Sequence, residues 1–169
     1  MLGLLALLLS AAPTEKLVEQ QLSLNLDIFR ATILSQTIHE ECAKSNIDPL
    51  LILAIMKVES SLNPDAISPV GARGLMQIMP VTEKWILESI AIDQIASYVA
   101  WDEPISNSRL GIAYFSYLIK RYLGNIRHAL VAYNSGPSAL DKLLISHEQI
   151  PTAYTTLISK RLRELKEIR

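Results

Sequence analysis

The sequence predicts an all-α, mainly helical fold, and three observations support this prediction. Half of the 169 residues are hydrophobic whereas only 6% are aromatic, a composition that favours a packed aliphatic globule over a disordered chain. Apolar residues recur at helical spacing along much of the chain, and no segment alternates apolar and polar residues as a half-buried strand does. Because no linker or repeat divides the chain, we expect a single domain over residues 15–169.

The first twelve residues have the composition of a secretory signal peptide. Met1 to Leu9 are almost wholly apolar, and Ser10 to Ala12 supply the small residues of a cleavage site. No Lys or Arg precedes Lys16, so a buried helix start or a misplaced start codon remains an alternative. A spanning helix is disfavoured because it needs about 20 apolar residues and Glu15 interrupts the run first. We expect residues 1–12 to be an export signal.

The first half of the domain is predicted to contain helices of two kinds. From Glu15 to Lys44 apolar residues recur at roughly helical spacing, which predicts one long or two short helices. Asp48 and Pro49 then supply an N-cap and a proline at the first helical position. Residues 50–58 are apolar on almost every side, the pattern of a helix that is buried all round.

The second half begins with a loop. Residues 63–74 contain two prolines and two glycines, which predicts a loop, with a small β hairpin left open over residues 63–80. Residues 75–79 are expected to turn back into the core. Periodicity and end signals predict four further segments: helices over residues 81–89, 108–122 and 126–133, the last closed by a turn at residues 134–137, and an amphipathic final helix over residues 160–169.

Charge and cysteine content exclude several classes of protein. Sixteen Lys and Arg against 17 Asp and Glu give a net charge of -1, without the basic excess of a nucleic-acid binder. The lone Cys42 permits no internal disulfide and supplies no zinc site by itself. His39, His128 and His147 show no ligand spacing. We therefore expect no metal, no cofactor and no nucleic-acid partner.

Glu59 is the most informative single residue. It is a carboxylate at the C-terminal end of an apolar helix, directly before the loop. Burial and the negative end of the helix dipole both raise the pKa of such a carboxyl group. A carboxyl group that stays protonated near neutral pH is what a general acid requires. A solvent-facing glutamate at a helix end fits the same position, so the sequence position leaves both interpretations open.

Two motifs resemble the soluble lytic transglycosylases, which cleave the glycan strands of bacterial peptidoglycan. The first covers 22 positions from Glu59 to Pro80 without a gap, and the second is Ala132-Tyr133-Asn134-Ser135-Gly136-Pro137. A looser resemblance runs from Ile47 to Tyr154, where Ile150 to Tyr154 is an altered form of a family segment. The resemblance implies a catalytic domain related to goose-type lysozyme, with extra N- and C-terminal helices.

The resemblance also implies a chemistry and a set of site residues. Glu59 would be the single catalytic acid/base for the bond between N-acetylmuramic acid and N-acetylglucosamine, giving 1,6-anhydro ends without water. The expected substrate-binding residues are Ser68, Gln77, Met79, Tyr133 and Asn134, with Tyr133 carrying the hydroxyl that approaches the acid. Turn stabilisation and ordinary core packing are the alternative roles of these side chains.

The same resemblance places the protein in the periplasm or otherwise outside the cytoplasm, with peptidoglycan as its partner. We expect a monomer, and the small size favours a partner in secretion, conjugation or other cell-envelope machinery. A hydrolytic muramidase and a catalytically silent wall-binding module are the alternatives. Trp85 and Trp101 fit either stacking on sugar rings or packing in the core.

Overall fold

The computed structural model describes residues 13–89 and 104–168, and this part of the chain is helical without any strand. The all-α prediction is therefore confirmed, whereas the predicted signal peptide and Trp101 lie outside the described residues. Within the described ranges, no helix is both long and apolar enough to span a membrane. The described helices are α2 (Pro13–Leu22), α3 (Ile28–Ser45), α4 (Pro49–Ser60), α5 (Pro80–Ser89), α6 (Pro104–Arg121), α7 (Ile126–Ser135), α8 (Pro137–Ser146) and α9 (Ala153–Glu167).

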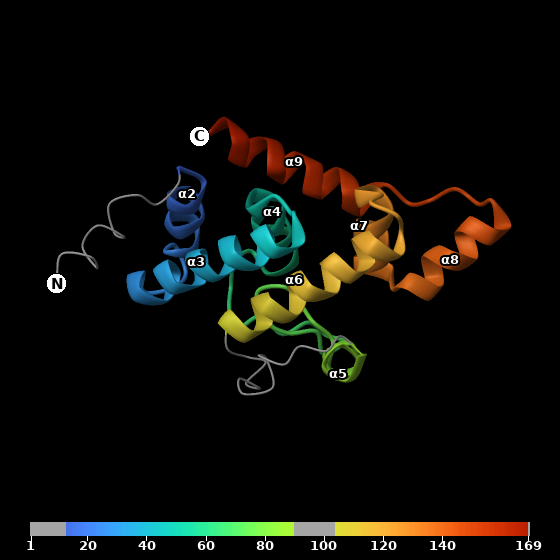
Figure 1. Ribbon diagram of the computed structural model, residues 1–169, viewed down its shortest axis with the longest axis horizontal. Coiled ribbons are helices and arrows are strands. Elements are labelled where there is room, and N and C mark those ends of the chain that lie inside the picture. The colour runs from blue at the N-terminus through green and yellow to red at the C-terminus, as the bar shows by residue number, and fades with distance from the viewer. Residues whose placement is uncertain (1–12, 90–103, 169) are drawn as a thin grey trace.

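Helix α4 forms the centre of the fold, and Figure 1 shows it between α3, α6 and α9. Its residues 50–56 are all buried, as the apolar run predicts. The Asp48 side chain accepts a hydrogen bond from the Leu50 N–H at 2.9 Å, so the predicted N-cap is present. The helix ends where Ser61 adopts a left-handed conformation with φ 55°. Helix α4 packs against α2, α3 and α9.

The N-terminal region forms two short helices rather than one long one. Asp27 caps α3 by accepting a hydrogen bond from the Arg30 N–H at 3.0 Å. The Ser35 hydroxyl of α3 donates to the Glu15 carbonyl of α2 at 2.8 Å. These contacts fold α2 back onto α3, and both helices then cover α4.

Three predicted boundaries in the C-terminal half are wrong. Helix α6 begins at Pro104 instead of residue 108. Helix α7 continues through Ser135, whose hydroxyl donates to the Val131 carbonyl one turn earlier. The predicted turn is thereby reduced to Gly136 (φ 82°), after which α8 follows, a helix that the sequence did not predict. Helix α9 begins at Ala153 instead of residue 160 and packs along α4.

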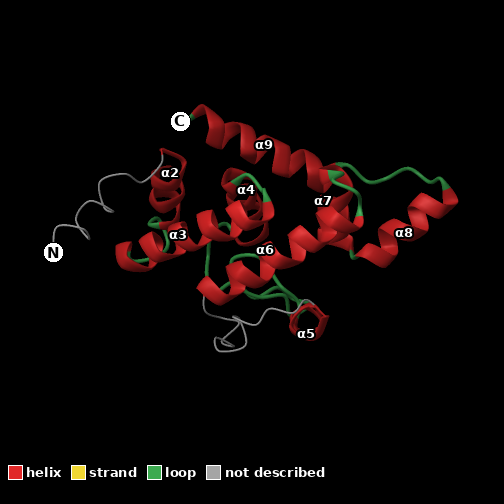
Figure 2. Cartoon of the chain, in the orientation of Figure 1, coloured by secondary structure: helices red, strands yellow, loops and turns green. Residues whose placement is uncertain are grey.

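Residues 61–79 form a loop, drawn as an irregular trace in Figure 2, which contains the loop predicted over residues 63–74. Leu75, Met76 and Ile78 are buried, as expected for a turn back into the core. The hairpin that the sequence left open does not form. Arg73 makes isolated bridges to Ile67 and Ile78, and these do not extend into strands. Backbone hydrogen bonds within the loop, such as those between Arg73 and Ile78, give it its shape. Side-chain contacts then attach the loop to the helices around the candidate site.

Candidate active site

Glu59 lies in the last turn of α4 and is half-buried. Burial raises the pKa of its carboxyl group above the ordinary value, and a hydrogen bond from Tyr154 opposes part of this rise. The sequence left open whether Glu59 faces solvent or an apolar environment. Its surroundings favour the protonated form, which is the form a general acid needs.

The hydrogen-bond partner of Glu59 comes from the other end of the chain. The Tyr154 hydroxyl of α9 donates to Glu59 Oε1 at 2.6 Å, across a sequence separation of 95 residues. The packing of α9 against α4 brings the two side chains together. Burial and the nearby Glu59 carboxylate raise the pKa of Tyr154, so the hydroxyl remains a donor. Tyr154 thus fixes the position of Oε1.

Tyr133 lies close enough to Glu59 for the carboxylate to raise its pKa, together with burial. Its hydroxyl, however, donates to the Met76 carbonyl at 2.8 Å. The ring packs against Tyr114 and Phe115 of α6, with centroids 5.7 and 5.9 Å away. In this structure Tyr133 therefore holds the loop, while Tyr154 contacts the acid.

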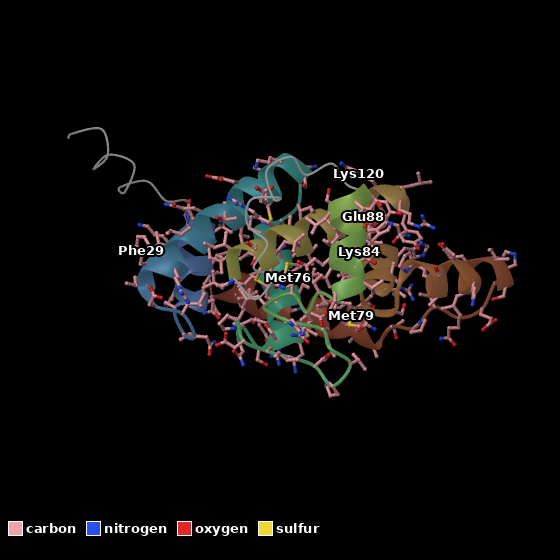
Figure 3. The ribbon with its side chains drawn as sticks, turned by 90° about the horizontal axis from the view of Figure 1, so that it is seen from below. Phe29, Met76, Met79, Lys84, Glu88 and Lys120 are labelled. Atoms are coloured by element: carbon pink, nitrogen blue, oxygen red, sulfur yellow. The ribbon has the colours of Figure 1, made fainter. Side chains whose placement is uncertain are left out.

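Asn107 of α6 holds the same loop from the opposite side. Its Oδ1 accepts from the Met76 N–H at 2.8 Å, and its Nδ2 donates to the Arg73 carbonyl at 3.0 Å. Asn107 is completely buried. The N–H and the carbonyl of Met76 are thus both bonded to side chains, one from α6 and one from α7. Figure 3 shows Met76 inside the molecule and Met79 where α5 begins.

Two glycines permit this close approach of the loop to α6. A Cβ on Gly74, which has φ 73°, would lie 2.5 Å from the Asn107 side chain. A Cβ on Gly111 would lie 2.3 Å from the sulfur of Met76. Both positions therefore require glycine for steric reasons, and Gly74 also for its backbone conformation. At the other edge, the Ser60 hydroxyl is 2.9 Å from the Leu75 carbonyl, to which it donates.

Gln77 and Ser68 make contacts within the loop itself. Gln77 has φ 48°, and its Nε2 donates to the carbonyls of Ala66 and Gly74, both at 3.0 Å. Ser68 Oγ accepts from the Ala72 N–H at 2.9 Å. These are the turn-stabilising contacts that the sequence left as an alternative, and a role in substrate binding stays a prediction for both residues.

Four of the five predicted binding residues line one cavity of about 270 Å³. They are Gln77, Met79, Tyr133 and Asn134, and Thr82 and Tyr114 complete much of the wall. Neither Ser68 nor Glu59 lines this cavity. Glu59 lies near one of the lining residues, since its charge raises the pKa of Tyr133. The arrangement places a protonatable carboxyl group near Tyr133, which is one wall of a cavity that also has amide and thioether walls.

Sequence reasoning missed two residues of this arrangement, Tyr154 as the partner of Glu59 and Asn107 as the anchor of the loop. A signal was present for Tyr154, because it ends the segment that resembles the family in altered form. Nothing in the local pattern of α6 marks Asn107. Among the described residues, no group of three or more His, Cys, Asp or Glu side chains is placed to hold a metal ion.

Comparison with known proteins gives consistent matches. The family model described as Transglycosylase SLT domain matches residues 36–152. A soluble lytic murein transglycosylase of Salmonella typhimurium is 39% identical over 85 residues, covering 50% of this chain and 13% of that protein. Membrane-bound lytic murein transglycosylase C of Mannheimia succiniciproducens is 33% identical over 151 residues, covering 83% of this chain and 42% of that protein.

A solved structure is similar to this chain as well. The lytic transglycosylase Slt of Pseudomonas aeruginosa, solved as an inactive mutant with glutamine in place of one glutamate, has a TM-score of 0.60 and 30% identity. The match covers 77% of this chain and 22% of that one. The chain therefore spans less than half the length of each of these proteins.

Proposed function

Because this chain belongs to the transglycosylase SLT domain family, we propose that it is a peptidoglycan lytic transglycosylase with Glu59 as its single acid/base. The observation that carries the proposal is the environment of Glu59. A half-buried carboxyl group with a raised pKa lies near Tyr133, a wall of the cavity, and a tyrosine hydroxyl fixes one of its two oxygens. The inactive glutamine variant of the Pseudomonas aeruginosa protein supports the importance of one glutamate in that enzyme.

The proposed reaction uses Glu59 twice. Protonated Glu59 donates its proton to the glycosidic oxygen between N-acetylmuramic acid and N-acetylglucosamine, and the bond from that oxygen to C1 breaks. The 2-acetamido oxygen of the muramyl sugar stabilises the oxocarbenium-like centre at C1. The Glu59 carboxylate then takes the proton of the 6-hydroxyl of the same sugar, and O6 bonds to C1. This closes the 1,6-anhydro ring and returns Glu59 to its protonated form.

The environment of Glu59 suits both half-reactions. Burial favours the protonated acid before cleavage, whereas the Tyr154 hydrogen bond stabilises the carboxylate after it. Because Tyr154 bonds to Oε1 at 2.6 Å, the carboxyl group cannot rotate freely. In this proposal Gln77, Met79, Tyr133 and Asn134 position the sugar in the cavity, and Ser68 supports the loop beneath it.

We further propose that the protein is exported to the periplasm or cell wall, with residues 1–12 as its signal. Relatives that act on murein support this location. The chain would act as a monomer that works with secretion, conjugation or cell-envelope machinery. Cell fractionation tests the export, because a full-length protein confined to the cytoplasm would contradict it.

The substitution Glu59→Gln tests the catalytic assignment. It keeps the size of the side chain but removes proton transfer, so clearing of purified peptidoglycan should fall by about 10²- to 10⁴-fold or more. The melting temperature should hold or rise. The control is Glu148→Gln, which changes an exposed glutamate in the loop before α9 and should clear the wall at the unaltered rate. A folded Glu59→Gln variant with near-normal clearing would place the acid elsewhere.

A further inference from the structure

A second and larger cavity, of about 510 Å³, lies beside the candidate site. Residues of α5, α6 and the first turn of α8 form its walls. Figure 1 shows α5 alongside α6, on the side of the molecule away from α2 and α9. Thr82 and Tyr114 line both this cavity and the smaller one. The two cavities therefore adjoin along these shared walls.

Aromatic rings form the floor of the larger cavity. The rings of Trp85 and Tyr117 have centroids 4.7 Å apart, and Tyr114 packs edge-on against Trp85 at 6.1 Å. Trp85 and Tyr117 are only half-buried, so part of their surface remains open to a ligand. Half-open aromatic surface of this kind suits the apolar C–H face of a sugar ring, and tyrosine and tryptophan also carry polar groups that can bond to sugar hydroxyls.

The charge in this cavity is balanced. Arg121 lines the cavity and forms an ion pair with Asp141 at 2.7 Å, and it also donates to the Tyr117 hydroxyl at 3.1 Å. The Tyr122 hydroxyl bonds to the other Asp141 oxygen at 2.9 Å. The guanidinium charge is therefore matched within the protein. This balance favours an uncharged ligand over the carboxylates of a peptide stem, while leaving polar groups that can bind hydroxyls.

We propose that this aromatic groove, formed by Thr82, Trp85, Tyr114, Tyr117 and Arg121, is an accessory subsite for an N-acetylated amino sugar further along the glycan strand. Trp85 and Tyr117 form the platform for the ring. The inference rests on the proposed function, since it names a further part of the same substrate. Its role is to favour long strands over short fragments.

The test measures binding without turnover, in a Glu59→Gln background. The soluble probes are N-acetylglucosamine oligomers of two and of six sugars. Trp101→Phe is added so that Trp85 is the only tryptophan left in the chain and its fluorescence alone reports binding. Addition of the hexamer should change the Trp85 fluorescence at saturation, and the dimer should do so much less.

Calorimetry then gives the energetic contribution of the ring. Trp85→Ala should weaken hexamer binding about tenfold, which corresponds to about 1.4 kcal/mol, and should leave dimer binding within twofold. Ser138→Trp, which fills the groove from the opposite wall, should cause the same loss if Trp85→Ala does not fold. Lys84→Ala on the exposed face of α5 is the matched control and should bind like the parent.

Two results would overturn the inference. The first is that the Trp85→Ala variant and the separate Ser138→Trp variant both fold and both bind the hexamer as tightly as the parent does. The other is Trp85 fluorescence that responds to a free stem peptide and not to the hexamer. Since the measurement needs no catalysis, it is independent of whether Glu59 is the acid. Failure of the proposed function would appear in the product analysis and not in this titration.

Discussion

Asn107→Leu is the most demanding test of how the loop is held. The substitution keeps roughly the volume of the side chain and removes both of its hydrogen bonds to the loop. The Arg73 carbonyl keeps a second bond, from the Ile78 N–H at 3.0 Å. The Met76 N–H, which donates to Asn107 Oδ1, is left buried without that acceptor. The main loss is therefore the hydrogen bond of the Met76 N–H, in the residue directly before Gln77.

The magnitude follows from these two losses. A buried donor without a partner costs about 1–3 kcal/mol, and the second hydrogen bond adds about 0.5–1.5 kcal/mol. We expect a loss of roughly 2–4 kcal/mol in the free energy of unfolding, which for a domain of this size lowers the melting temperature by roughly 5–15 °C. Catalytic efficiency should fall about tenfold, because Gln77 directly follows the released peptide and Met79 lies two residues further on.

Thermal melting and wall-clearing assays would measure both effects. Asn25→Leu makes the same substitution at an exposed position between α2 and α3 and should change stability by no more than about 0.5 kcal/mol. Tyr133→Phe should cost about 1 kcal/mol through its bond to Met76, and the double variant should show coupling because both side chains hold one peptide. An Asn107→Leu variant that melts with the parent would refute this account of the loop.

Three further outcomes follow from the site. Tyr154→Phe removes the hydrogen bond that lowers the pKa of Glu59, so this pKa should rise. The loss of activity at alkaline pH should then move to higher pH in a pH–rate profile. An unchanged profile, or a shift to lower pH, would contradict the contact between Tyr154 and Glu59. Because burial raises the pKa of Glu59 in the folded protein, stability should decline as pH rises from the ordinary pKa through the raised one, and Glu59→Gln should flatten that decline in melts across pH. Gly111→Ala should cost about 1–3 kcal/mol in urea unfolding, since its Cβ would overlap Met76, and an unchanged midpoint would show that the helix can shift freely.

The sequence predicted those elements whose signals are local. Helix α4 was located almost to the residue, because Asp48 and Pro49 mark its start and its interior is apolar on every side. Helix α8 was missed because only Leu140 is buried in it, which leaves little periodic signal. The start of α9 was missed because its charged, visibly amphipathic part begins only at Lys160.

In the candidate site, too, the features with a local sequence signal were predicted and those without one were missed. Glu59 was found from its position at the end of an apolar helix and from the motif that follows it. The contact with Tyr154 joins residues 95 positions apart, and Asn107 lies 31 positions from Met76. Such pairs depend on helix packing, which no local pattern encodes. The direction of the Tyr133 hydroxyl, toward Met76 instead of the acid, is likewise set by how α7 lies against the loop.

The most direct measurement of the central claim is a mass spectrum of the muropeptides that the purified protein releases from peptidoglycan. If Glu59 alone delivers the proton to the glycosidic oxygen and recovers one from the 6-hydroxyl, the products carry 1,6-anhydro ends and are one water lighter than hydrolysis products. Product formation should disappear with Glu59→Gln and persist with Glu148→Gln. Reducing ends as the dominant product would contradict the proposed transglycosylase chemistry and indicate hydrolysis.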